Sequence, residues 1–395
     1  MVGTGAGVPH YWQALATVLG QDHEVHVFTA QANRESLDGI VVHKVHAPLL
    51  GWFLLHVGFY IAVRTRFALD RLLRRQGFDL ILGIGALTPF ADVATVHFVQ
   101  ARELDLQARG LFPPERPSGG LASIDYALYS RSMGWLGRNF YRRSRTRIVA
   151  ISEAVKQDLV LFEGASASAI EVVPNGVDVD RFHPSNRVLY RAETRAKLGL
   201  TDKNPMVLFV GNSWGRKGLC TAIEAIRGDD MADVRLVVVG DGSESAFLEG
   251  VPADVASRII FAGRNQLAIE RFYAAADVFL LPTLYEPFGL VILEALAGGV
   301  PTIVSATAGA SEWLADGIDA LLLQDPSDGE EARAALRSIL ESAALAASLS
   351  RSGRLKAETL QWGRVADRII ATVPARSPVS KSLTPAPVSA IPLEI

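Results

Sequence analysis

The chain has 395 residues, of which 49% are hydrophobic and 21% are charged, so it is long enough to form two globular cores. Its formal net charge of −3 argues against a nucleic-acid-binding protein, because such proteins need a strong basic excess. The single cysteine, Cys220, has no partner for an internal disulfide or a cysteine metal site, which suits a reducing cytoplasm.

The first half of the sequence alternates short aliphatic runs with longer helical patterns, which is typical of parallel α/β architecture. We predict strands at residues 24–29, 39–45, 79–82, 92–96, 147–151 and 171–174. Helical patterns run to about Arg75 and through residues 121–143. Ser152 is placed to cap a helix that begins at Glu153.

The longest apolar run is Leu49–Val63, which is 15 residues long. A helix needs roughly 20 apolar residues to span a bilayer, so this run is too short. We favour a buried helix and keep a membrane-surface segment as the alternative, since a cluster of arginines follows directly. These arginines are Arg64, Arg66, Arg71, Arg74 and Arg75.

The alternation of strands and helices starts afresh in the second half. We predict strands at residues 206–210, 235–239, 259–261, 278–281, 302–304 and 320–323. The expected fold is therefore α/β, with two doubly wound, Rossmann-like domains at residues 1–178 and 179–373. Residues 374–395 are rich in Ser, Pro and Ala and are expected to be a disordered tail. Because ligands of such sheets bind beyond the carboxyl ends of the strands, we expect the site in the cleft between the domains.

The main chemical motif lies between Val278 and Glu294, where an apolar strand leads through a short loop into a helix. The helix N-terminus offers unpaired N–H groups to a phosphate, and Gly289 lets the backbone approach such a ligand. Glu286 lies at the mouth of the loop, where it can accept hydrogen bonds from sugar hydroxyls. Glu294 lies in an apolar segment, so its carboxylate needs a partner, such as the hydroxyls of a ribose.

A second motif is Phe209–Gly218, in which a strand ends at Gly211 and two cations, Arg216 and Lys217, precede a helix. Adjacent cations at this position can clamp a diphosphate and neutralise the charge on a leaving group. An exposed basic pair on a loop is the alternative. Gly240 ends a third strand, and Arg264 follows a fourth, where it can stack on a base or lie exposed in solvent.

The spacing of Glu286 and Glu294, with Pro287-Phe288-Gly289 between them and Ala297-x-Gly299-x-Pro301 behind them, resembles the E-x7-E motif of family-4 retaining glycosyltransferases. The resemblance covers roughly residues 7–370 and implies the two-domain GT-B fold. It implies donor binding by the two glutamates, by Phe288, Gly289 and Leu290, by Gly211 and Gly240, and by Arg264. It also implies that Glu286, Arg216 and Lys217 act in catalysis, together with His97.

Two positions in the first half also resemble that family. His97, at the end of a predicted strand, is similar to the histidine that reaches the transferred sugar. Gly5 and Gly7 resemble the glycine loop near the donor phosphates. Only Met1 and Val2 precede Gly3, so the strand that leads into this loop is missing from the sequence. We therefore expect the natural protein to begin upstream with a short apolar strand.

The resemblance implies a retaining transfer of a sugar from a UDP- or GDP-sugar to a glycan, a glycolipid or a small molecule. No metal or other cofactor is expected, because cationic side chains take the place of a divalent ion. We expect a cytoplasmic protein, and peripheral contact with the inner face of the membrane stays open as an alternative. A sugar phosphorylase, an epimerase and a catalytically weak structural partner in glycan assembly remain as alternatives.

Overall fold

A computed structural model describes the backbone of residues 7–29, 39–45, 51–72, 78–88, 90–111, 120–143, 146–264, 268–373 and 388–393. The chain forms two compact units. Unit 1 comprises residues 1–106, 114–175 and 362–395, and unit 2 comprises residues 107–113 and 176–361. The predicted boundary after residue 178 lies close to this division, whereas the C-terminal boundary differs from it.

Unit 1 is built on a seven-stranded sheet in the order β2-β1-β13-β3-β4-β5-β6, and all neighbouring strands in it run parallel. Its strands are β1 (Val25–Thr29), β2 (Val41–Lys44), β3 (Leu80–Ile84), β4 (Val93–Val96), β5 (Arg147–Ala150), β6 (Ile170–Val172) and β13 (Val388–Leu393). β1 and β4 are buried along their whole length, as expected for strands covered on both faces.

The helices of unit 1 include those predicted before Arg75, over residues 121–143 and from Glu153, together with others that were not predicted. They are α1 (Val8–Leu19), α2 (Gly51–Leu72), α3 (Gln100–Ala108), α4 (Gly120–Arg143), α5 (Glu153–Asp158), a π-helix at Leu159–Glu163 and α14 (Trp362–Ala371). Neither α1 nor α3 was predicted from the sequence. Ser152 caps α5 as expected, because its Oγ accepts a hydrogen bond from Val155 N at 3.1 Å.

α14 belongs to unit 1, although the sequence analysis assigned residues up to 373 to the second domain. The Trp362 ring lies edge-on to Tyr11 of α1, with 5.3 Å between the ring centroids. Arg368 donates from Nη2 to the carbonyl oxygen of Val172 at the end of β6. These contacts with α1 and β6 explain why the last helix packs on the first unit.

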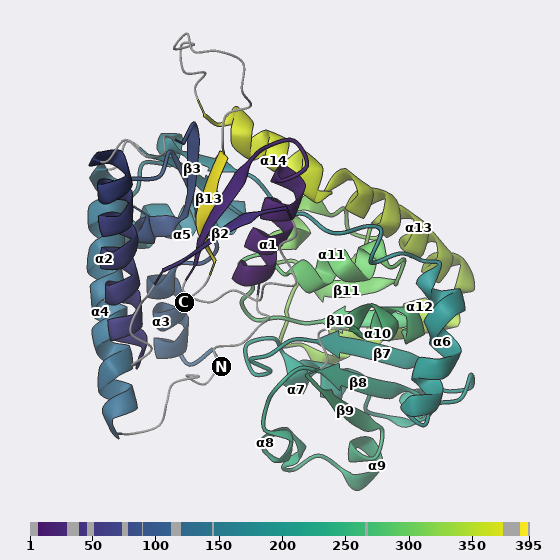
Figure 1. The fold of residues 1–395 in the computed structure, drawn as a ribbon. Helices are drawn as coiled ribbons and strands as arrows, with labels where there is room; N and C mark the ends of the chain where they lie inside the picture. Colours follow the sequence, from purple (N-terminus) through teal and green to yellow (C-terminus); the bar gives the residue numbers. More distant parts are fainter. Residues whose placement is uncertain are drawn as a thin grey trace. The chain divides into compact units, whose positions relative to one another are not determined.

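β13, from the far end of the chain (yellow in Figure 1), occupies an interior position of the unit 1 sheet, between β1 and β3. Val388 pairs with Val25 of β1 on one side and with Leu80 of β3 on the other. The prediction of a disordered tail is therefore wrong for residues 388–393. The prediction rested on the Ser, Pro and Ala content of the whole tail and overlooked the short aliphatic segment within it. The sheet also does not lack the central strand that the sequence analysis found missing.

Unit 2 is built on a six-stranded parallel sheet in the order β12-β11-β10-β7-β8-β9. Its strands are β7 (Met206–Val210), β8 (Arg235–Val239), β9 (Ile259–Gly263), β10 (Val278–Leu281), β11 (Thr302–Ser305) and β12 (Leu321–Leu323). The predicted strands of this half coincide with these to within two residues at each end. Their aliphatic side chains are buried on both faces, which is why the sequence shows continuous apolar runs.

The helices of unit 2 cover this sheet. They are α6 (Asn186–Lys197), α7 (Leu219–Ala225), α8 (Glu244–Leu248), α9 (Ala253–Ala256), α10 (Ile269–Ala275), α11 (Leu290–Ala297), α12 (Gly329–Glu341) and α13 (Ala343–Thr359). Arg354 of α13 donates to the carbonyl oxygens of Val179, Phe182 and Ala297. The predicted α/β class with two doubly wound, parallel domains is confirmed.

In the part of the chain that the structure describes, no helix is both long enough and apolar enough to span a bilayer. Helix α2 includes most of the apolar Leu49–Val63 run. Leu55, Phe59 and Val63 are buried in the core, while Leu54 and Ile61 are 46% and 56% exposed. The run therefore forms a core helix with a second, exposed apolar face.

Candidate active site in the second unit

The strand order of unit 2 changes direction between β10 and β7. From β7 the chain proceeds outward to β8 and β9, and from β10 it proceeds the other way to β11 and β12. In an open parallel sheet, such a switch point leaves a crevice outside the carboxyl ends of the two central strands. The loops Gly211–Gly218 and Pro282–Gly289 follow these two strands. Topology alone therefore points to the same two loops that the motifs identified.

Arg216 and Lys217 of the first loop converge on Glu286 of the second. Lys217 Nζ lies 2.7 Å from Glu286 Oε2, and Arg216 Nη1 lies 3.7 Å from the same oxygen. Arg216 Nη1 also donates to the carbonyl oxygen of Tyr285 at 2.6 Å. The three charged side chains are 11–18% exposed, so the cluster is largely buried but still reaches solvent.

The cluster keeps Glu286 ionised. Burial is the largest influence on its pKa and raises it, but the charges of Lys217 and Arg216 and hydrogen bonds from Lys217 and the Phe288 backbone outweigh that effect. The net result is a pKa below the usual value. One carboxylate faces two cations, so the site carries a net positive charge and favours an anion.

Glycines let the backbone close in around this cluster. A Cβ on Gly211 would lie 2.2 Å from Lys217 Cδ, and one on Gly240 would lie 2.1 Å from the carbonyl oxygen of Gly211. Gly218, with φ of +77°, has no room for a side chain because a Cβ would meet the carbonyl oxygen of Pro282 at 1.8 Å. The two predicted glycines therefore shape the carboxyl edge of β7 and β8.

Helix α11 begins at the same edge. Gly289 precedes it with φ of +96°, Phe288 is 2% exposed, and Leu290 is half-buried. The backbone of the loop is fixed, because Gly309 N donates to the Glu286 carbonyl and Ala310 N donates to the Phe288 carbonyl. The first turn of α11 lies just after the loop that carries Glu286. Ile292 N of this turn donates to the Gly289 carbonyl, and the positive end of the helix dipole suits a phosphate.

Glu294 lies on α11 and is half-buried. Tyr273 of α10 is 1% exposed and donates from Oη to Glu294 Oε2 at 2.9 Å. Burial first, and then the neighbouring Glu294, raise the pKa of Tyr273 well above its usual value, so its hydroxyl stays protonated. The sequence analysis missed Tyr273. The signal available was a tyrosine within a helix that is otherwise apolar on its buried side.

Arg264 follows β9 and lies near the loop after β8. Its Nη1 lies 3.5 Å from Asp241 Oδ2, and Asp241 N donates to Asn212 Oδ1. These three residues link the ends of β7, β8 and β9. Arg264 is about one-third exposed, so a base can reach it.

His97 and Gly7 lie in unit 1 and are described within that unit. His97 follows β4 and Gly7 precedes α1, which places both at the carboxyl edge of the sheet. His97 is 8% exposed, its Nε2 lies 3.1 Å from Thr95 Oγ1, and Tyr11 of α1 contacts its ring edge-on. Burial lowers the pKa of His97 to about 3, so the ring is neutral at physiological pH. Gly5 lies outside the described residues.

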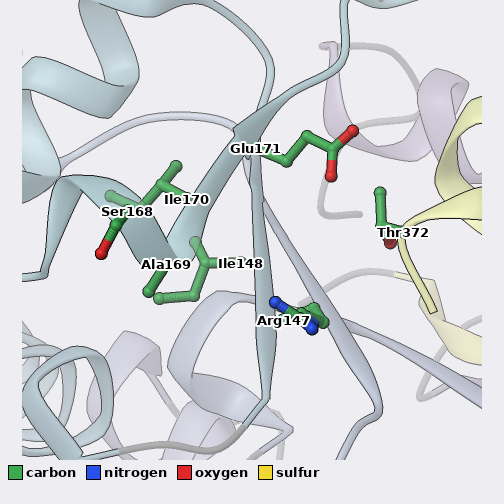
Figure 2. Close-up of a pocket in the computed structure, with 7 residues that line it drawn as sticks. All are labelled: Arg147, Ile148, Ser168, Ala169, Ile170, Glu171 and Thr372. Atoms are coloured by element: carbon green, nitrogen blue, oxygen red, sulfur yellow. The ribbon is translucent and has the colours of Figure 1, made fainter. Parts of the chain in front are cut away.

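A shallow pocket in unit 1 lies away from these residues (Figure 2). It is lined by Arg147 at the start of β5, by Ile170 and Glu171 of β6, and by Thr372 after α14. Strands begin here, so the pocket is at the amino edge of the sheet. Ligands of parallel sheets bind at the opposite edge, so we do not assign it a catalytic role.

Among the described residues, no group of three or more His, Cys, Asp or Glu side chains is arranged to hold a metal ion. The ionisable residues at the switch point are mainly cations that face one carboxylate.

Comparison with known families places both halves of the chain. Residues 5–181 match the family model for Glycosyltransferase Family 4, and residues 190–356 match that for Glycosyl transferases group 1. The chain belongs to the family-4, group 1 glycosyltransferases, and its fold is GT-B.

Curated relatives cover different shares of this chain. It is 28% identical over 297 residues to the GDP-mannose-dependent monoacylated alpha-(1-6)-phosphatidylinositol monomannoside mannosyltransferase of Corynebacterium glutamicum, which covers 70% of this chain and 77% of the relative. It is 31% identical over 237 residues to the D-inositol 3-phosphate glycosyltransferase of Segniliparus rotundus, with 57% of this chain and 51% of the relative covered. The chain spans 44% of an uncharacterized glycosyltransferase of Methanocaldococcus jannaschii, at 29% identity over 170 residues, or 42% of this chain.

Solved structures share the fold. WaaG, a glycosyltransferase involved in lipopolysaccharide biosynthesis, superposes with a TM-score of 0.72 at 21% identity, over 95% of this chain and 98% of WaaG. HepE of Anabaena, solved with UDP and glucose, gives a TM-score of 0.64 at 19% identity, over 94% of this chain and 97% of HepE. At these identities the likeness concerns the fold.

Proposed function

We propose that this protein is a retaining glycosyltransferase that uses a nucleoside diphosphate sugar as its donor. One observation carries the proposal: Arg216 and Lys217 converge on Glu286 at the switch point of the unit 2 sheet, directly before the N-terminus of α11. A net positive charge beside a helix N-terminus suits a diphosphate. The carboxylate among them suits the hydroxyls of a sugar.

The proposed reaction is a front-side displacement at the anomeric carbon. The acceptor oxygen forms its bond on the face from which the diphosphate leaves, and the departing phosphate oxygen takes the acceptor proton. Arg216 and Lys217 stabilise the negative charge that grows on the diphosphate. Glu286 orients the sugar, and Glu294 holds the ribose. His97, neutral at physiological pH, contributes a hydrogen bond to the transferred sugar.

We propose that the reaction needs no divalent metal, because two cationic side chains already face the diphosphate position. The test is turnover in EDTA, which is expected to leave activity largely intact. Complete loss of activity in EDTA, restored by Mg²⁺, would overturn this part of the proposal.

The donor base and sugar can be identified by saturation-transfer NMR against a panel of UDP- and GDP-sugars. Relatives support both bases, since one is GDP-mannose-dependent and the HepE structure contains UDP. We expect nucleotide sugars with one of the two bases to show a saturation-transfer signal. Adding the corresponding nucleoside diphosphate is expected to remove that signal by competition. No transfer from any nucleotide sugar would contradict the proposed donor class, and would favour a phosphorylase that uses free phosphate.

The proposed acceptor is a glycan, a glycolipid or a small molecule, and the proposed location is the cytoplasm. A catalytically weak structural partner was suggested by the missing first strand. With β13 between β1 and β3 in the interior of the sheet, that reason no longer applies.

A further inference from the structure

Three polar groups surround the hydroxyl of Thr95, which is fully buried on β4. Thr95 Oγ1 donates to the carbonyl oxygen of Gly83 on β3 at 3.5 Å, and it lies 3.1 Å from His97 Nε2. The Thr95 side chain also forms a hydrogen bond with the hydroxyl of Tyr11, which is 1% exposed on α1. The Tyr11 ring packs edge-on against the His97 ring, with 4.3 Å between the centroids. Thr95 and Tyr11 together therefore fix the orientation of the His97 ring.

A hydroxyl carries only one proton, which limits how the three contacts of Thr95 can be satisfied. The carbonyl oxygen of Gly83 can only accept, so it takes the Thr95 proton. The Tyr11 hydroxyl keeps its own proton, because burial raises its pKa above the usual value. Thr95 then has lone pairs for two donors. His97 Nε2 fills one of these positions only if that nitrogen carries the ring proton.

The second ring nitrogen of His97 favours the same tautomer. In the part of the chain that the structure describes, Nδ1 has no hydrogen-bond partner, and the residue is 8% exposed. A buried N–H group without a partner is rarer in proteins than a buried acceptor without one. The proton is therefore better placed on Nε2, where Thr95 accepts it. Burial lowers the pKa of His97 to about 3, so the ring is neutral and holds a single N–H proton.

We propose that Thr95 and Tyr11 are positioning residues that hold His97 in the Nε2–H tautomer, so that Nδ1 offers a lone pair to the substrate. The hydrogen bond made by one ring nitrogen sets the protonation of the other. A lone pair accepts from a hydroxyl but cannot donate to a carbonyl or phosphate oxygen, so the group that fits Nδ1 is a sugar hydroxyl. This last step rests on the proposed function, in which His97 contacts the transferred sugar. The tautomer does not depend on it.

The tautomer can be measured by two-bond ¹H–¹⁵N correlation NMR of the full chain labelled with ¹⁵N-histidine, without any ligand. The signals of His97 are those that His97→Gln removes. We expect the parent chain to carry the proton on Nε2. Thr95→Val keeps the side-chain shape and removes the acceptor at Nε2, so the minor tautomer is expected to rise about ten-fold. Thr95→Ser restores the hydroxyl and is expected to restore the parent tautomer.

Two further variants show which hydroxyl acts on His97. Thr88→Val is the matched control, because Thr88 is 2% exposed and its Oγ1 has no hydrogen-bond partner within the described residues. It is expected to leave the tautomer unchanged. Tyr11→Phe is expected to have a smaller effect than Thr95→Val, because the Gly83 carbonyl still takes the Thr95 proton. Thermal melting checks that each variant is folded.

A parent chain with the proton on Nδ1 would overturn the proposal, and so would a tautomer ratio that Thr95→Val leaves unchanged. Binding is measured separately, by titration with UDP-glucose, GDP-mannose, UDP and GDP. Thr95→Val is expected to weaken binding of the nucleotide sugar about ten-fold and to leave the nucleoside diphosphate unaffected, because His97 is proposed to contact only the sugar. Equal weakening of both ligands would contradict the positioning role. If the parent chain bound no nucleotide sugar, the proposed function would fail, whereas the NMR measurement would still decide the tautomer.

Discussion

The ionised state of Glu286 depends on the positive charges of Lys217 and Arg216. The folded protein lowers the pKa of Glu286, so the ionised form is favoured by folding. This contribution to stability is present above the pKa of the unfolded state and is lost as the pH falls through the folded value. The same charges that hold the carboxylate are the ones proposed to hold the diphosphate.

Replacing either cation tests whether it acts on the transition state. Lys217→Ala and Arg216→Ala are expected to lower kcat more than they raise KM, because the charge on the leaving diphosphate grows during the reaction. Lys197→Ala, an exposed lysine on α6, is the control. Steady-state kinetics measure the changes in kcat and KM separately. An effect confined to KM would show that Arg216 and Lys217 bind the donor in the ground state without stabilising the transition state. Thermal melting of each variant separates these effects from loss of fold.

Tyr273 and Glu294 are hydrogen-bonded, and the coupling free energy between them in nucleotide binding can be measured. Glu294→Gln is expected to weaken binding of the nucleoside diphosphate by about 1–3 kcal/mol, the range for a lost charged hydrogen bond. Tyr273→Phe is expected to weaken it less, because the carboxylate remains but loses the hydroxyl that orients it at 2.9 Å.

Calorimetric titration of both single variants and the double variant gives the coupling between them. The two losses are expected to be non-additive. Unchanged affinity in a folded Glu294→Gln variant would contradict the ribose assignment. Strict additivity would show that Tyr273 does not act through Glu294.

At the scale of elements, the π-helix Leu159–Glu163 ends in a glutamate that is buried and has a raised pKa. Glu163 is 5% exposed and packs against Gly137 of α4, where a Cβ would lie 2.9 Å from Glu163 Oε2. Burial raises its pKa from 4.5 to about 7, against the opposing charges of Arg138 and Arg142. The folded protein therefore prefers the neutral acid. The stability that this preference contributes is complete below pH 4.5 and is lost as the pH rises through about 7.

Glu163→Gln keeps the shape of the neutral acid at every pH. The variant is expected to melt a few degrees higher than the parent chain at pH 8, and about the same at pH 5. Melting curves at the two pH values measure the difference, with the exposed Glu249→Gln as the control. A shift of the same size at both pH values would contradict the role of ionisation.

The sequence predicts the elements of unit 2 better than those of unit 1 for a physical reason. β7, β8 and β10 are buried on both faces, so Met206–Val210 and its neighbours appear as uninterrupted apolar runs. The cluster around Glu286 was predictable because its residues follow strand ends. Tyr273 was not, since its role depends on how α10 packs against α11. β13 was not, because its partners are remote in sequence.

At the scale of the whole molecule, unit 1 depends on its last strand. Removing residues 374–395 takes away the neighbour of both β1 and β3, and each backbone group left unpaired costs about 1–3 kcal/mol. A domain is stable by only about 5–15 kcal/mol. The shortened chain is expected to lose the cooperative melting of unit 1 and to keep that of unit 2. Hydrogen exchange of β1 and β3 measures this directly.

A point variant refines the test. Ala390 pairs with Leu82, and Ala390→Pro removes a donor in the middle of the strand. The variant is expected to raise exchange in β1 and β3 while leaving β7 and β8 protected. Unchanged exchange in both the shortened chain and Ala390→Pro would show that unit 1 does not need this strand.

The pairing of β13 also affects the order in which the molecule acquires its structure. The ribosome synthesises its partner β3 about 310 residues earlier, and its partner β1 about 360 residues earlier. Contacts between such distant segments form slowly, because the intervening chain must first be closed into a loop. Unit 2 is nearly contiguous in sequence and can complete its sheet during synthesis. The unit 1 sheet stays incomplete until β13 has been synthesised. During that interval the backbone N–H and C=O groups of β1 and β3 that face β13 are unpaired, so other strands can pair with them.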